Sequence, residues 1–117
     1  MRSGQIVLVD WRDALPGSGE PNKRRPGVVV GSSSFFGTGL PFEIVVPLTG
    51  EKQLTIPDAS LLILPTKENG CTKACYALSW CVQTMPHLRI TETASRISED
   101  ELLQIRSQVC NCVTNGA

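Results

Sequence analysis

Gln5-Ile-Val-Leu-Val-Asp-Trp11 is a run dominated by aliphatic and β-branched residues, and it decides the fold class of this chain. A glycine precedes it and Pro16-Gly-Ser-Gly19 follows it, which is typical of a buried strand bounded by turns. Pro26 then opens a second run, Gly27-Val-Val-Val30, and proline is tolerated at the first residue of a strand. The two runs predict a β-rich core that starts near the N-terminus.

Further short segments carry the strand pattern along the chain. They are Glu43 to Leu48, Gln53 to Ile56, Ser60 to Leu64 and Ala77 to Val82. The 10 glycines and 8 prolines favour turns over long helices. Because 117 residues fit one domain, we expect residues 1–117 to form a single, mainly β domain, a small barrel or sandwich.

A C-terminal helix is predicted by its capping residues. Ser98 fits the N-cap, Glu101 completes a capping box, and Ile97 and Leu102 fit a hydrophobic staple. Apolar residues then recur at spacings of three and four: Leu102, Ile105, Val109 and Val113. We expect this stripe to seat the helix on the strands as a structural lid.

Charge and cysteine content exclude several classes of protein. The 11 basic and 11 acidic residues cancel, so any binding of nucleic acid must depend on a local patch. No aliphatic stretch approaches the roughly 18 residues that span a bilayer, and we find no signal peptide, so a cytoplasmic protein is expected. The five cysteines are an odd number, which favours reduced thiols.

The cysteines and the single histidine form no recognisable metal motif. Cys71-x3-Cys75-x5-Cys81 and Cys110-x-Cys112 lack the paired spacing of a zinc ribbon. His87 alone cannot supply a two-histidine ribonuclease site, and Ser32-Ser-Ser34 lacks a nucleophile elbow. We therefore expect no metal and no cofactor.

The segment from Ala14 to Arg25 lacks apolar periodicity and ends in Lys23-Arg24-Arg25, so it is expected to be a long exposed loop. Such a basic cluster is more often a solvated surface than a catalytic one. Glu20 fits a general base, a base-edge contact or a solvated residue without a catalytic role. Trp11 is more often a core or dimer residue, although stacking on an unpaired base would contribute about 1–3 kcal/mol.

The ordered set of these segments resembles the MazF/PemK family of toxin endoribonucleases from bacterial toxin–antitoxin pairs. The residues that carry the resemblance are Val9-Asp10, the loop with Glu20, Arg25-Pro-Gly-Val-Val-Val30, Ser32-Ser-Ser-Phe-Phe36 and Val45-Val-Pro-Leu-Thr49. The resemblance is clearest over residues 4–50 and continues more weakly through Tyr76-Ala-Leu78 to the helix at Ser98.

This resemblance implies a small SH3-like β-barrel with a C-terminal α-helix and a homodimer whose groove binds single-stranded RNA. It implies sequence-specific, metal-independent cleavage of mRNA, and a cognate antitoxin that occupies the groove and the dimer seam. The usual catalytic pair of the family falls on Arg25 and Thr49. Substrate contacts are expected from Glu20, Lys23, Arg24 and Trp11.

The chemistry of this pair is intelligible from the residues themselves. When a ribose 2′-hydroxyl attacks the adjacent phosphate, negative charge concentrates on the non-bridging oxygens. The guanidinium of Arg25 is a planar, permanently charged fork that can bind two of those oxygens. The hydroxyl of Thr49 can hold the phosphate or relay a proton with little side-chain freedom to lose.

One segment departs from the family pattern. Many members carry Asp-Gln-x-Arg-Thr after the fifth or sixth strand, where this chain has Trp80-Cys-Val-Gln-Thr-Met85. Whether Gln83 or Cys81 takes the glutamine place, the acid and the arginine are both lost. The departure keeps open an alternative function, a non-catalytic barrel that acts as a binding module or a toxin that inhibits DNA gyrase. Thr66 to Cys75 also has no clear counterpart in the family.

Overall fold

The computed structural model describes residues 1–12, 14–15, 24–36 and 39–114. Its strands are β1 (Gln5–Val9), β2 (Arg25–Val29), β3 (Phe42–Thr49), β4 (Leu61–Ile63), β5 (Cys75–Ala77), β6 (Gln83–Pro86) and β7 (Ile90–Arg96). The helices are α1 (Ser33–Phe36) and α2 (Glu99–Thr114), with 3-10 turns η1 (Lys52–Leu54), η2 (Ser79–Cys81) and η3 (His87–Arg89). No helix of the described residues has the length and apolar character that a membrane crossing requires.

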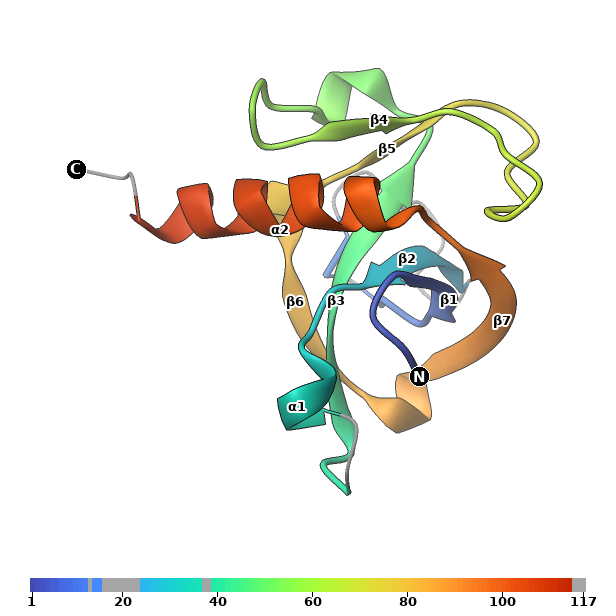
Figure 1. Cartoon of the computed structure of the whole chain (residues 1–117), viewed down its shortest axis with the longest axis vertical. Coiled ribbons are helices and arrows are strands. Elements are labelled where there is room, and N and C mark those ends of the chain that lie inside the picture. Colours follow the sequence, from blue (N-terminus) through green and yellow to red (C-terminus); the bar gives the residue numbers. More distant parts are fainter. Residues whose placement is uncertain (13, 16–23, 37–38, 115–117) are drawn as a thin grey trace.

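The seven strands form one antiparallel sheet in the order β4-β5-β3-β2-β1-β7, and β6 also pairs with β3. Figure 1 shows α2 running alongside this sheet, between the β4–β5 hairpin and strands β1 and β2. The short helix α1 lies at the opposite end of the molecule from that hairpin (Figure 1). The predicted class, mainly β with a C-terminal helix, is confirmed.

β3 is the central strand because it meets two partners on one edge. Leu48 pairs with Ala77 of β5, and Val45 pairs with Gln83 of β6. These two pairs are three residues apart along β3, from Val45 to Leu48, but six residues apart along the partner segment, from Ala77 to Gln83. The surplus forms the 3-10 turn η2, whose start is held by the Leu78 amide donating to the Pro47 carbonyl at 2.9 Å. The prediction of one strand over Ala77 to Val82 is therefore wrong beyond Ala77.

Each face of the sheet buries an apolar cluster, as the continuous apolar runs of β1 and β2 require. Val28 and Val30 belong to a cluster that also contains Ile97, Leu102 and Ile105 from around α2. On the other face the buried residues are Val7, Val9, Trp11, Leu15, Val29, Val45 and Met85. Burial on both faces makes the β1–β2–β3 layer the rigid part of the fold.

The predicted capping box of α2 is confirmed. The Glu101 amide donates to Ser98 Oγ at 3.1 Å, and the Ser98 amide donates to the Glu101 carboxylate at 2.9 Å. Ile105 is fully buried and Val109 packs against the same cluster. Val113 is 77% exposed, which contradicts its predicted place in the stripe, because the last turn of α2 extends beyond the strands (Figure 1).

One further predicted strand is absent from the described residues at its predicted place, and one observed strand was not predicted. Gln53 to Ile56 is not a strand, since η1 is closed by hydrogen bonds to the carbonyls of Glu51 and Lys52. β7 was not predicted because its sequence, ITETASR, is mostly polar, and it forms a strand through pairing with β1.

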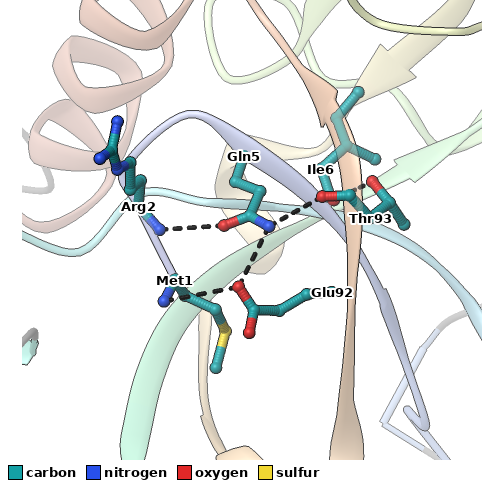
Figure 2. A network of polar contacts seen from close by, with 6 residues as sticks. All are labelled: Met1, Arg2, Gln5, Ile6, Glu92 and Thr93. Atoms are coloured by element: carbon teal, nitrogen blue, oxygen red, sulfur yellow. Dashed lines mark hydrogen bonds and ion pairs between the residues drawn. The ribbon is translucent and has the colours of Figure 1, made fainter.

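A network of polar contacts ties the N-terminal segment to β7 (Figure 2). The side-chain Nε2 of Gln5 donates to the Glu92 carboxylate at 3.2 Å and to the Thr93 carbonyl at 2.8 Å. The N-terminal amine of Met1 lies 3.5 Å from the same carboxylate. Thr93 Oγ1 donates to the Ile6 carbonyl at 2.6 Å. The network bridges the point where the β1–β7 register shifts.

Candidate active site

The residues predicted as catalytic come from the facing ends of neighbouring strands. Arg25 begins β2 and Thr49 ends β3. The register pairs Gly27 with Pro47, and continuing it by two residues places Arg25 across from Thr49. Directly opposite residues of an antiparallel pair project to the same face of the sheet. The strand register therefore brings the guanidinium and the hydroxyl to one end of the sheet.

Arg25 carries an unsatisfied donor. Its Nε is buried and has no hydrogen-bond partner among the described residues. Its backbone is held in place, because Trp11 Nε1 donates to the Arg25 carbonyl at 3.1 Å. A buried donor without a partner costs about 1–3 kcal/mol, and an anionic ligand that accepts from it would remove this cost.

Trp11 lies in the core and does not offer a stacking surface. It is 1% exposed, and a Cβ added at Gly27 would lie 2.9 Å from its Cζ2. The expectation that Trp11 contacts substrate by stacking on a base is therefore not supported by this structure, whereas its interpretation as a core residue is. It supports the site by anchoring the backbone of Arg25.

Thr49 is oriented by the turn that follows it. The Glu51 amide donates to Thr49 Oγ1 at 3.1 Å, which leaves the hydroxyl hydrogen available for a phosphate oxygen. Thr49 and Gly50 also line a groove of about 330 Å³. A Cβ at Gly50 would meet nothing within 4 Å, so the backbone here is open to a ligand.

The far wall of this groove is the segment 69–75, which the sequence did not connect with the site. It contributes Asn69, Cys71, Lys73 and Cys75 to the lining, and β7 contributes Ser95. Lys73 brings a positive charge to the groove that also contains Thr49. Only the side-chain packing of the fold reveals this connection.

Three arginines, Arg12, Arg24 and Arg89, lie near the end of β1 and form a local basic patch, the arginine patch. Arg24 Nη1 donates to the Arg89 carbonyl at 2.8 Å, and Arg89 Nε donates to the Asp10 carbonyl at 3.0 Å. Arg12 Nε lies 3.5 Å from the Asp10 carboxylate. Arg24 was predicted as a substrate contact, while Arg12 and Arg89 were not. Glu20 and Lys23, also predicted, lie outside the described residues.

A second groove, of about 370 Å³, lies between the N-terminal segment and β7. Its lining includes Met1, Gln5, Glu92 and Thr93, whose polar groups already bond to one another (Figure 2). We therefore place the candidate site at Arg25 and Thr49. In the part of the chain that the structure describes, no group of three or more His, Cys, Asp or Glu side chains could hold a metal ion.

Comparison with known protein families assigns the chain to one of them. The family model described as "PemK-like, MazF-like toxin of type II toxin-antitoxin system" matches residues 2–113. The chain belongs to this family. The predicted membership in the MazF/PemK group is thereby confirmed, whereas no curated protein sequence matches the chain significantly.

Solved structures share the fold of this MazF-like toxin at low sequence identity. MazF from Deinococcus radiodurans is 18% identical, with 93% of this chain and 92% of that chain covered and a TM-score of 0.68. A mycobacterial endoribonuclease in complex with its cognate antitoxin is 12% identical, with 100% and 98% covered and a TM-score of 0.73. The Mycobacterium tuberculosis toxin MazF-mt6 is 14% identical, with 92% and 94% covered and a TM-score of 0.69.

Residues Trp80 to Met85, where this MazF-like toxin lacks the acid and the arginine of the family pattern, contact the start of the segment 14–25. Gln83 Nε2 donates to the Ala14 carbonyl at 3.0 Å, where the segment 14–25 begins. Met85 is buried in the cluster that contains Trp11. Trp80 Nε1 donates to the Leu54 carbonyl at 3.0 Å. Structural contacts thus occupy these positions, and Gln83, Met85 and Trp80 bring no charge to this part of the surface.

Proposed function

We propose that this toxin is a sequence-specific endoribonuclease that cleaves single-stranded RNA without a metal ion. The observation that carries the proposal is a buried Arg25 Nε that has no partner among the described residues, at the end of β2 where the register continued from Gly27–Pro47 sets Thr49 opposite. A guanidinium with a free donor beside an oriented hydroxyl suits a phosphate whose negative charge increases during reaction.

The proposed reaction uses the substrate's own nucleophile. The ribose 2′-oxygen attacks the adjacent phosphorus and the 5′-oxygen of the next nucleotide leaves, giving a 2′,3′-cyclic phosphate and a 5′-hydroxyl. Arg25 binds two non-bridging oxygens of the phosphorane, and Thr49 donates its hydroxyl to the phosphate. Glu20 is proposed to accept the 2′-hydroxyl proton or to contact a base edge, and Lys23 to contact the RNA.

The arginine patch is proposed to hold the RNA backbone. Arg12, Arg24 and Arg89 lie around the end of β1 through their contacts with Asp10 and with one another. In a chain whose formal net charge is zero, such a patch can supply the local attraction that phosphates require. Raising the salt concentration should therefore weaken RNA binding steeply, and Arg24→Ala should make the salt dependence shallower.

Two protein partners are proposed. A cognate antitoxin would cover the groove and the arginine patch; the mycobacterial relative is in complex with its cognate antitoxin. A second copy of the chain would form a homodimer, for which exposed apolar side chains such as Phe35 (72%) and Leu88 (79%) provide surface. Trp11 is buried and contributes nothing to that surface. Light scattering that gives a monomeric mass at high micromolar concentration would contradict the dimer.

The deciding experiment identifies the ends of the cleaved RNA. Purified toxin is incubated with a single-stranded RNA library in excess EDTA, and the products are sequenced after end-specific ligation. We expect cleavage at a defined sequence with 2′,3′-cyclic phosphate and 5′-hydroxyl ends, because attack by the neighbouring hydroxyl leaves those ends. Loss of cleavage in EDTA would reject this mechanism. Binding without cleavage would instead support the binding-module alternative, which the lost charges between Trp80 and Met85 favour.

A further inference from the structure

The segment 66–75 is a structured turn with its own hydrogen bonds. Asn69 is 3% exposed, and its Oδ1 accepts from the amides of Thr66 at 3.0 Å and Cys71 at 2.9 Å. Its Nδ2 donates to the Leu64 carbonyl at 2.9 Å. These bonds fix the backbone on both sides of Asn69. The turn therefore holds Cys71 in a defined position.

Cys71 and Cys75 lie at the end of this turn, close enough for a hydrogen bond between their side chains. Both thiols are free and partly buried, and both line the groove that contains Thr49. Cys75 begins β5 and pairs with Ile63, while the next residue, Tyr76, pairs with Thr49. Burial and then the charge and hydrogen bond of Cys71 raise the pKa of the Cys75 thiol to about 12.

The other three cysteines have different surroundings. Cys110 and Cys112 are exposed on the last turns of α2. Cys81 is buried and accepts a hydrogen bond from Gln83 Nε2 at 3.3 Å. Only Cys71 and Cys75 combine mutual contact with a place in the groove wall. The exposed pair on α2 offers a matched control within the same chain.

We propose that Cys71 and Cys75 form a thiol-modification site that reacts with a low-molecular-weight disulfide and closes an intramolecular disulfide in the wall of the groove. The sequence motif C-x3-C fits neither a zinc site nor a redox motif with C-x2-C spacing. The effect on RNA cleavage rests on the proposed function, whereas the reaction of the two thiols does not.

The reaction with glutathione disulfide proceeds in two exchange steps. Cys71, as a thiolate, attacks one sulfur of glutathione disulfide, which forms a mixed disulfide and releases one glutathione thiolate. Cys75 then loses its proton to solvent and attacks the Cys71 sulfur, which forms the intramolecular bond and releases the second glutathione thiolate. The protein loses two protons and two electrons, and one glutathione disulfide gains them to become two glutathione molecules.

Cys71 carries out the first attack because Cys75 is held protonated. Burial and the neighbouring Cys71 keep the pKa of Cys75 near 12, so its thiolate is scarce at neutral pH. Once Cys71 is in the mixed disulfide, it can no longer carry the negative charge that opposes ionisation of Cys75. The order of the two steps follows from this asymmetry.

Closing the bond would change the wall that faces Thr49. Sulfur atoms in contact must approach to about 2 Å to form a disulfide, so the backbone from Cys71 to Cys75 has to adjust. Lys73 lies in the middle of this segment and lines the groove with Thr49. Displacing a positioned charge beside a reacting phosphate is expected to lower the cleavage rate on the order of tenfold.

The chemical test follows the thiols directly. The full chain is incubated with glutathione disulfide in the presence of a metal chelator, and intact mass and peptide mapping locate the products. We expect a peptide joined through Cys71 and Cys75, in the wild type and in the Cys110→Ser/Cys112→Ser control. Cys75→Ser should stop at the mixed disulfide on Cys71. Failure to form the 71–75 linkage in folded wild-type protein, or linkage at other cysteines alone, would overturn the proposal.

The functional test compares RNA cleavage by the same samples before and after reduction. The rate of each reduced protein, wild type, Cys71→Ser or Cys75→Ser, is the reference for its own oxidised sample. The oxidised wild type should lose about tenfold in rate and recover with dithiothreitol, while Cys71→Ser, which lacks the attacking thiol, should be insensitive. Cys75→Ser carries a glutathione on Cys71 after the same treatment, so its rate measures the effect of the mixed disulfide and not that of the 71–75 bond. A 71–75 disulfide with an unchanged rate would refute the regulatory role. Absence of cleavage by the reduced wild type would instead refute the proposed function, with the mass result still deciding the thiol site.

Discussion

The two ends of the β2–β3 pair place ionisable groups in opposite situations. At one end, the register continued from the Gly27–Pro47 pair sets Arg25 across from Thr49, and Arg25 Nε has no partner among the described residues. Pro26 and Thr49 line a groove at this end. At the other end the same register places Gly31 across from Glu43, which is only 2% exposed. The Ile44 amide donates to Glu43 Oε1 at 3.0 Å. One strand pair thus keeps a charge available for a ligand and encloses another within the protein.

This difference teaches that register alone does not make a site. Both ends carry an ionisable side chain and a neighbouring arginine, but Arg106 at the Glu43 end already donates to the Val30 and Gly31 carbonyls, whereas the Arg25 end has open backbone at Gly50 and a groove. At the Glu43 end, a Cβ on Gly31 would clash with the carboxylate and lie 2.9 Å from Phe36 Cδ2, so this end is closed. Changes at the first end should affect cleavage, and changes at the second should affect stability.

Arg25→Ala should have the largest effect. It removes the charge proposed to stabilise the phosphorane, and we expect kcat/KM for RNA cleavage to fall on the order of 10²–10³-fold with little change in stability. Arg25→Lys should restore little, because a point charge does not reproduce the bidentate fork. Arg2→Ala, at the other end of the sheet, is the charge-matched control and should cleave normally. Wild-type rates in Arg25→Ala would remove Arg25 from the mechanism.

Thr49→Ala should reduce cleavage on the order of 10²-fold, because it deletes one positioned donor to the phosphate. RNA binding should weaken less than the rate, which a binding isotherm measured alongside single-turnover kinetics would reveal. Thr49→Ser retains the hydroxyl and should recover part of the rate. Equal losses in the alanine and serine variants would indicate that the methyl group, not the hydroxyl, matters.

Gly31→Ala tests the closed end. A methyl group here has no room between Glu43 and Phe36, so we expect a loss of about 1–3 kcal/mol in the free energy of unfolding, measured with urea. Gly50→Ala is the matched control, since its Cβ meets nothing within 4 Å. A loss in the control as large as that in Gly31→Ala would show that glycine backbone freedom, not crowding, is responsible.

Glu43→Gln should make stability less dependent on pH. Burial raises the pKa of Glu43 above its ordinary value of 4.5, while the hydrogen bond from the Ile44 amide and then the charges of His87 and the N-terminus oppose this shift. An acid with a raised pKa binds protons more tightly in the folded state, so stability falls as the pH rises from 4.5 through the raised pKa.

Each unit by which folding raises the pKa of Glu43 corresponds to about 1.4 kcal/mol of stability that is lost once the pH exceeds the raised pKa. Glutamine keeps the shape without ionising, so the variant should be more stable than wild type at about pH 8 and should lose this advantage toward about pH 4. Urea unfolding at several pH values measures the difference. Parallel profiles for the two proteins would show that folding does not raise the pKa of Glu43.

Much of the fold was predictable because its signals are local. The apolar runs of β1, β2 and β3 and the Ser98 capping box each specify their element within a few residues. β7 and the η2 turn depend on pairing with distant strands, and no local pattern indicates such pairing. Local sequence patterns therefore predicted the central strands β1, β2 and β3 better than the strands at the edges of the sheet.

The candidate site divides in the same way. Arg25 and Thr49 could be proposed from the family resemblance, and the register explains why they lie at one end of the sheet. The Trp11 orientation, the Arg89 contact and the groove wall at Cys71 arise from side chains that pack across long separations in sequence. Those contacts become visible only once the chain is folded.

The β4–β5 hairpin is attached to β3 by two residue pairs, at Leu48 and Thr49. Gln108 of α2 reinforces this attachment, since its Nε2 donates to the Ser60 carbonyl at 3.0 Å and its Oε1 accepts from Ser79 Oγ at 2.7 Å. So short a junction makes the hairpin a candidate for local opening that leaves the β1–β2–β3 layer intact. In hydrogen exchange, amides of β5 should then exchange before those of β2, and each opening would free the edge of β3 beside Thr49. The lifetime of that edge would set how long an extended segment has to pair with it.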